Sequence, residues 1–337
     1  MERAADRPPV FCMRTRFVIC LIAVWLPLAA AGDTTVTVFD DNYIHFTPDD
    51  PTRYDTEDVA ADDNGRVASH SLTLPEISGP TRITAHLVIK PIPQDELVVH
   101  DKWDRAGNVT VRVDGLPLEL VKFVTAYGGR TEFDVDLTHL APVLTGPVII
   151  DAFIDTWVTP AWQVDLDLHY QTDTTVANPL WATPLFYDQS FTTATEADGG
   201  IEAAVEIPAG LSKVLLHYLV SGHCTDGRGA DEFVSKDNVL SVDGTVVYRY
   251  QPWRDDCIEF RAINPYTRRW SDGTWSSDYS RSGWCPGDII EPLSLNLSDH
   301  LPGEQQHRVG LQIEDVRPAD TADHRGYWRV SAYLIGY

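Results

Sequence analysis

Residues 239–248 read Val-Leu-Ser-Val-Asp-Gly-Thr-Val-Val-Tyr, with strand-forming residues on both sides of Asp243-Gly244. An Asp-Gly pair in this position is typical of a two-residue hairpin, because glycine supplies the positive φ that a type I′ turn requires. The stretch therefore predicts two antiparallel strands joined by a tight turn.

Alternation of apolar and polar residues recurs along the rest of the chain, whereas helical periodicity is scarce. In a strand, alternation gives one face to the core and the other to water. The clearest runs are residues 36–38, 109–113, 133–137 and 164–168. We therefore predict an all-β protein made of antiparallel β-sandwiches or jelly rolls rather than an α/β fold.

The length of 337 residues exceeds one ordinary domain. Residues 172–185 form a polar stretch with two prolines and no alternation. We expect this stretch to be a linker between an N-terminal domain, 33–171, and a C-terminal domain, 186–337. Each would have the size of a β-sandwich.

The first residues have the pattern of an export signal. Arg14 and Arg16 precede an apolar run, Phe17–Ala31, which ends in small residues. We expect residues 1–31 to be a signal peptide and the mature protein to be secreted or periplasmic, with no membrane attachment after cleavage. The alternative is an uncleaved anchor, for which the run is short.

The charge balance narrows the choice of partner. With 26 Lys+Arg against 50 Asp+Glu, the formal net charge is −24, which excludes general affinity for nucleic acid or for anionic membranes. A carbohydrate or a polypeptide fits better, and a monomer is the default. Residues 49–63 contain seven acids. We interpret this segment as a solvated loop, with a calcium-binding loop as the weaker alternative.

Three cysteines follow the expected signal: Cys224, Cys257 and Cys285. An odd number in an exported protein suggests one disulfide and one remaining thiol, and the spacing leaves all three pairings open. No C-x-x-C spacing occurs, so we expect no metal site.

Two short segments combine acids with tryptophan. In Trp103-Asp104-Arg105, the guanidinium can hold the acid ionised; the alternative is a surface ion pair. In Asp155-Thr156-Trp157, strand alternation places Asp155 and Trp157 on one side. The indole could then stack on a sugar ring. The alternative is that Asp155 lies at the edge of the sheet and Trp157 is buried in the core.

The densest region combines Ser221–Cys224, Asp231–Phe233 and the loop 252–287, which holds several tryptophans and glycines. Long loops of this composition usually bind or catalyse, although one held by its own aromatics is the alternative. His223 is the only histidine in such a loop. Because no nucleophile elbow, Walker loop or dinucleotide fingerprint occurs, we expect no cofactor.

Taken in order, segments 103–109, 155–157, 221–233 and 281–287 resemble the peptide-N-glycosidase F family, and the resemblance extends over about residues 33–337. It implies two eight-stranded antiparallel jelly rolls packed side by side, with a cleft at their interface. It also implies a secreted amidase that hydrolyses the bond between asparagine and the innermost N-acetylglucosamine of N-glycoproteins or glycopeptides. The products are aspartate and a glycosylamine, and no metal is needed.

The resemblance assigns the primary catalytic acid to Asp104 and a second acid to Glu232, while Asp155 stands where the family has a Glu. We expect Asp104 to stay ionised beside Arg105 and to activate water, and Glu232 to be its coupled partner with a raised pKa. Asp155 would hold water or a sugar hydroxyl. We assign substrate binding to five residues: Trp103, Arg105, Trp157, His223 and Arg281.

The resemblance also implies a Cys257–Cys285 disulfide. Three departures stand out: no cysteine pair precedes Trp103, only Cys224 lies near Glu232, and Asp155 is one methylene shorter than the family Glu. Two other functions compete with the amidase. A glycan-binding protein with an inactive cleft would bind without turnover, and a glycosidase would cleave between sugars and leave one on the asparagine.

Overall fold

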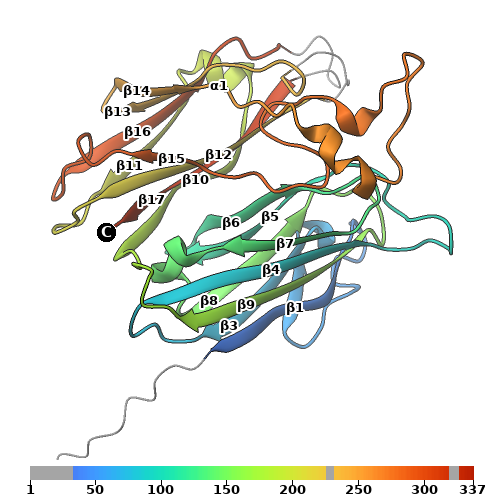
Figure 1. Cartoon of the computed structure of the whole chain (residues 1–337), viewed down its shortest axis with the longest axis horizontal. Coiled ribbons are helices and arrows are strands. Elements are labelled where there is room, and N and C mark those ends of the chain that lie inside the picture. The colour runs from blue at the N-terminus through green and yellow to red at the C-terminus, as the bar shows by residue number, and fades with distance from the viewer. Residues whose placement is uncertain (1–32, 225–230, 319–325) are drawn as a thin grey trace, which may run out of the picture. The chain divides into compact units, whose positions relative to one another are not determined.

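The structure is a computed structural model that describes residues 33–224, 231–318 and 326–337. Antiparallel strands make up four sheets in this part of the chain (Figure 1). The all-β prediction is confirmed. The expected signal peptide, residues 1–31, lies outside the described residues. Within them, no helix combines the length and apolar character needed to cross a membrane.

The first two sheets come from the N-terminal half and face each other as a sandwich. Their orders are β1-β9-β4-β7 and β2-β3-β8-β5-β6, and the short 3-10 helices η1 (Asp63–Gly65) and η2 (Thr138–Val143) lie between strands. The strands are β1 (Thr34–Ile44), β2 (Val59–Asp62), β3 (Val67–Leu74), β4 (Thr81–Pro91), β5 (Ala106–Val113), β6 (Leu116–Val124), β7 (Thr131–Asp136), β8 (Gly146–Ile154) and β9 (Trp162–Thr172).

The other two sheets come from the C-terminal half, with orders β10-β17-β12-β15 and β11-β16-β13-β14. Their strands are β10 (Trp181–Phe191), β11 (Ile201–Glu206), β12 (Val214–Cys224), β13 (Asn238–Val242), β14 (Thr245–Tyr250), β15 (Leu293–Asn296), β16 (Gln306–Ile313) and β17 (Gly326–Gly336). A short helix, α1 (Thr193–Ala197), follows β10, and the 3-10 helices η3 (Cys257–Ile263) and η4 (Ser276–Asp278) lie in the long loop after β14.

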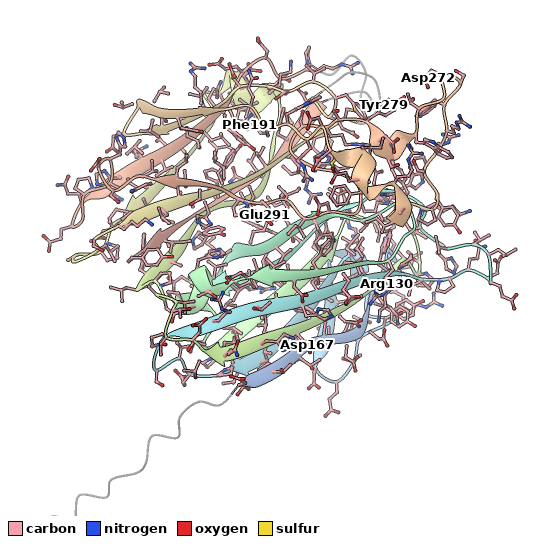
Figure 2. All side chains as sticks on the ribbon, viewed as in Figure 1. Arg130, Asp167, Phe191, Asp272, Tyr279 and Glu291 are labelled. Carbon is pink, nitrogen blue, oxygen red and sulfur yellow. A yellow bond between two sulfur atoms is a disulfide. The ribbon has the colours of Figure 1, made fainter. Side chains whose placement is uncertain are left out.

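The alternation seen in the sequence matches the burial of the strands. In β9, Val164, Leu166 and Leu168 are buried, whereas Asp165 and Asp167 are partly exposed. Figure 2 labels Asp167 on this strand. One face of the strand therefore contributes to the core and the other meets water.

The hairpin predicted at Asp243-Gly244 is present. Both residues have positive φ, 48° and 76°, and Val242 lies opposite Thr245 across the turn. This is the geometry of a type I′ turn, which matches the right-handed twist of the two strands.

The strand-free stretch between the halves is shorter than the sequence suggested. We expected a linker over 172–185, but only residues 173–180 lie between β9 and β10, and Trp181 already pairs with Gly336. The sequence pattern did not indicate a strand here because the stretch contains Pro184. Proline is tolerated there because β10 is an edge strand of its sheet.

The two halves join through β6, which packs against β10 and β17. The core of the first half includes Leu219, Tyr333 and Ile335 from the second. The long loop after β14 also reaches the first half, where Ile289 pairs with Phe123 of β6. The loops of the second half are thereby fixed against the strand ends of the first (Figure 1).

Candidate active site

The buried guanidinium of Arg281 brings together two acids from different halves. Its Nε donates to Oε1 of Glu232 at 3.1 Å, and its Nη2 lies 3.8 Å from Oδ2 of Asp104. The Arg281 side chain is only 1% exposed. A charge this deeply buried needs partners, and the two carboxyls supply them.

Further contacts fix the orientation of Arg281. Nη1 donates to the carbonyl of Tyr279 at 2.9 Å, and Nη2 donates to the carbonyl of Ser276 at 2.8 Å. The guanidinium also lies 4.7 Å from the ring centre of Trp284 and 5.2 Å from that of Phe233. Figure 2 labels Tyr279 in this loop. Planar stacking with several donors used at once is a geometry that lysine could not reproduce.

The backbone around Arg281 explains the glycine in its motif. Arg281 exchanges two backbone hydrogen bonds with Arg254, of 2.8 and 3.0 Å. Gly283 has φ +86°, and a Cβ at this position would lie 2.6 Å from the carbonyl oxygen of Val220. Only glycine permits that conformation and that approach.

Asp104 is surrounded by groups that act on its pKa in opposite directions. Burial raises the pKa, while Arg281 and a hydrogen bond with the Tyr127 hydroxyl lower it, and the net pKa is raised. The hydroxyl of Tyr127 also accepts from Nη2 of Arg281 at 3.4 Å. Asp104 is therefore a carboxyl that keeps its proton more readily than one in water.

Arg105 favours the ionised form of Asp104 less than we expected. Arg105 is instead paired with Asp101, from its Nε to Oδ2 at 2.9 Å and from its Nη2 to Oδ1 at 3.2 Å. The nearby cation of Asp104 is Arg281, which lowers the pKa of Asp104 more than Arg105 does. Arg105 therefore acts on the site by ordering the segment that carries Asp104.

Asp101 is a site residue that the sequence reasoning missed. It is fully buried, and it accepts from the Thr156 hydroxyl at 2.7 Å and from the Trp103 amide at 3.2 Å. It thus ties segment 103–105 to segment 155–157. Residues 101–105 form no helix, so their spacing along the chain did not mark this pair.

Tyr127 was also missed. It precedes Gly128 and Gly129, and a Cβ on Gly129 would lie 1.8 Å from the carbonyl oxygen of Ile263. The amide of Tyr127 donates to the side chain of Asn264 at 2.8 Å. The paired glycines marked a close approach between the two halves.

Glu232 has a pKa raised to about 7. Burial is the largest cause, Arg281 opposes it, and the nearby Asp104 raises the pKa further. The thiol and the backbone amide of Cys224 both lie 3.4 Å from Oε2 of Glu232, on the side away from the Arg281 contact. Two coupled carboxyls with raised pKa values are suited to holding and passing a proton.

Asp155 is bound to other arginines. Its Oδ1 lies 3.0 Å from Nη1 of Arg66, and its Oδ2 lies 3.3 Å from Nη1 of Arg329. Its amide donates to the carbonyl of Ala106 at 2.9 Å, which places it beside the segment of Asp104. Among the described contacts, its carboxylate has none with Arg281.

The remaining predicted binding residues differ in exposure. Trp157 and Trp103 are open to solvent, at 59% and 52%. His223 is buried, with its ring centre 5.2 Å from that of Trp284 and 5.3 Å from that of Tyr327. Burial lowers the pKa of His223 well below its usual value, so the ring is neutral and supports the packing around Arg281.

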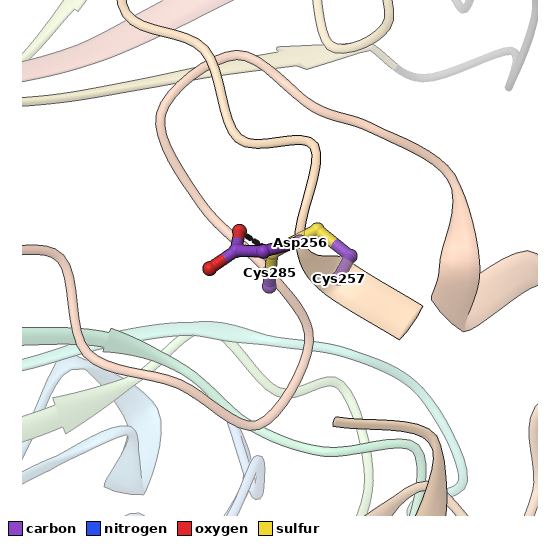
Figure 3. Close-up of side chains that lie close together, drawn as sticks. All are labelled: Asp256, Cys257 and Cys285. Carbon is purple, nitrogen blue, oxygen red and sulfur yellow. Dashed lines mark hydrogen bonds between the residues drawn. A yellow bond between two sulfur atoms is a disulfide. The ribbon is translucent and has the colours of Figure 1, made fainter. Parts of the chain in front are cut away.

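The structure contains the disulfide Cys257–Cys285, drawn in Figure 3. Asp256 Oδ1 lies 3.7 Å from Sγ of Cys285. This trio has the compactness of a metal site, but sulfurs joined to each other offer no thiolate. A second compact group, Asp40, Asp41 and Asp165, has Lys90 as its cation.

Comparison with known proteins supplies the context for this geometry. A model of the C-terminal part of peptide-N-glycosidase F matches residues 190–335. The structure of PNGF-II aligns with a TM-score of 0.80 at 25% identity, covering 90% of this chain and 65% of that one. The C-terminal part of the chain is thus similar to the peptide-N-glycosidase F family, and the described chain shares the fold of PNGF-II.

Two further family structures share the fold. Recombinant peptide:N-glycanase F aligns with a TM-score of 0.68 at 18% identity, covering 90% of this chain and 95% of that one. PNGase F from Flavobacterium meningosepticum, described as a glycosylasparaginase, gives 0.66 at 18%, covering 90% and 96%. The chain spans about 65% of the length of PNGF-II. Comparison with curated protein sequences finds no match.

Proposed function

We propose that the protein is an amidase that hydrolyses the bond between asparagine and the innermost N-acetylglucosamine of N-glycoproteins or glycopeptides. The observation that carries the proposal is the convergence of Asp104 and Glu232, from different halves of the chain, on the buried Arg281. The similarity of residues 190–335 to the C-terminal part of peptide-N-glycosidase F, and the fold shared with PNGF-II, support it.

In this proposal, one proton is shared between Asp104 and Glu232 near neutral pH, because burial raises the pKa of both carboxyls and Asp104 raises that of Glu232 further. Ionised Asp104 accepts a proton from water, and the water oxygen attacks the carbonyl carbon of the asparagine side chain. The carbon–nitrogen bond breaks as the nitrogen takes a proton from Glu232. Arg281 keeps its charge and stabilises the negative charge that develops.

The products are aspartate and a glycosylamine. Exposed Trp157 and Trp103 would contact the sugar, with Asp155 beside them. An indole stacks on the apolar face of a pyranose. The net charge of −24 does not repel a neutral sugar. We propose that the protein acts as a secreted monomer on N-glycosylated substrates.

The test is incubation of the purified protein with an N-glycopeptide in isotopically labelled water, with both products read by mass. The proposal expects aspartate carrying the label and a released glycan. Asp104→Asn should abolish release while the protein stays folded. The control Asp134→Asn changes an exposed acid of β7 that pairs with His86 and should retain activity. Release that persists in Asp104→Asn overturns the assignment.

A second candidate function is a glycan-binding protein with an inactive cleft. The observation that favours it is Asp155, whose two oxygens are engaged by Arg66 and Arg329, where the family resemblance has a longer Glu. Glycopeptide binding without any labelled aspartate would decide for this alternative.

A further inference from the structure

Arg66, which lies between η1 and β3, contacts both an acid and an aromatic group of the proposed sugar site. Its Nη1 is 3.0 Å from Asp155 and its Nη2 is 2.8 Å from Asp63. Its guanidinium carbon lies 4.8 Å from the ring centre of Trp157 and 5.5 Å from that of Phe46. One partly buried side chain therefore joins the acid and the indole.

Trp157 is exposed, yet it is supported by its neighbours. Phe46 meets its ring edge-on, with centroids 5.0 Å apart and an angle of 61° between the planes, and the guanidinium of Arg66 covers the ring. An unsupported surface indole would lose rotamer freedom when a ligand binds. The contacts with Phe46 and Arg66 restrict the indole of Trp157 before any ligand arrives.

The backbone of this segment is fixed from both sides. The amide of Ile154 donates to the carbonyl of Arg66 at 3.1 Å, and the amide of Asp155 donates to the carbonyl of Ala106 at 2.9 Å. Ala106 follows Asp104 by two residues. The position of Arg66 is thus linked through Asp155 to the segment that carries the proposed catalytic acid.

We propose that Arg66 is a positioning residue that holds Trp157 and Asp155 as one preformed platform for an N-acetylglucosamine ring. The platform recognises the sugar through the indole and delivers it beside Asp104. The identity of the sugar ligand rests on the proposed function, whereas the positioning of Trp157 by Arg66 rests on contacts within this chain.

Two variants separate the roles of the guanidinium. Arg66→Met keeps much of the apolar reach but loses both ion pairs and the cationic stacking, and Arg66→Lys keeps a charge without the planar fork. The dissociation constant for N,N′-diacetylchitobiose should rise about 10-fold in Arg66→Met and about 3-fold in Arg66→Lys. For glycopeptide turnover, KM should rise by similar factors while kcat stays within about 2-fold.

Arg82→Met is the control. Arg82 also bridges two acids of the first half, Asp136 at 3.1 Å and Asp173 at 2.8 Å, but none of the described aromatic contacts involves it. The control loses comparable ion pairs and should bind the sugar as the wild type does. A purely structural role of Arg66 predicts equal effects of the two methionine variants.

Fluorine NMR of the fluorotryptophan-labelled full chain provides a readout that needs no sugar. The Trp157 resonance is assigned as the one missing in Trp157→Phe. It should shift or broaden in Arg66→Met, because the ring loses its support, and should stay unchanged in Arg82→Met.

The outcomes separate this inference from the proposed function. Unchanged sugar affinity and an unchanged Trp157 resonance in Arg66→Met overturn the positioning role, even if the wild type is an active amidase. A second outcome is that Arg66→Met binds the sugar more weakly than the wild type, while the wild type produces no labelled aspartate. This result supports the platform and overturns the amidase function. A wild type that does not bind the chitobiose overturns the platform.

Discussion

Glu232→Gln should make the protein more stable above neutral pH while it removes activity. The folded protein raises the pKa of Glu232 from 4.5 to about 7, chiefly by burial. The native state therefore binds a proton that the unfolded state releases at lower pH. The stability that this proton contributes is present below about pH 4.5 and is lost as the pH rises through about 7.

The size of the effect follows from the pKa. The difference between 4.5 and about 7, at about 1.4 kcal/mol for each pH unit, gives about 3 kcal/mol. Glutamine mimics the protonated side chain and never ionises. Glu232→Gln should therefore leave the free energy of unfolding nearly unchanged at about pH 4.5 and should raise it by about 3 kcal/mol at about pH 8.

Urea unfolding followed by fluorescence at these two pH values measures the effect, with equal m-values required in both proteins. Glu206→Gln, an exposed substitution on β11, serves as the control and should show no such pH dependence. A Glu232→Gln variant that is less stable than the wild type at about pH 8 would show that burial is not the dominant influence on this carboxyl.

Three further outcomes follow from other contacts. Replacing Cys257 and Cys285 together by serine opens a disulfide with a sequence separation of 28, and calorimetry should show a loss of about 3–4 kcal/mol. Because a hydrogen bond from Cys224 lowers the pKa of Glu232, Cys224→Ala should move the pH profile of activity to higher pH, whereas Cys224→Ser should restore it. Burial lowers the pKa of His139 from 6.5 to about 4, so between these pH values the unfolded state binds a proton that the folded state does not, and stability falls as the pH drops; His139→Gln should reduce this acid destabilisation in a pH series of melting temperatures.

The fold class could be predicted from the sequence because its cause is local. Alternation in β9 and the Asp-Gly turn after β13 fix which face of a strand is buried and where the chain reverses. The start of β10 could not be predicted in this way. Its pairing with β17, far along the chain, decides that a proline-containing stretch forms an edge strand.

The site was predictable only as a set of segments. The order of the motifs along the chain was enough to identify the residues with suitable chemistry, among them Asp104, Glu232 and Arg281. How these residues pair depends on the folded arrangement: Arg105 binds Asp101, while Arg281 approaches Asp104 across the junction of the two halves. Successive side chains of an extended chain point in different directions, so residues adjacent in sequence need not contact each other. A buried charge is stabilised by whichever opposite charge lies close to it in the folded protein.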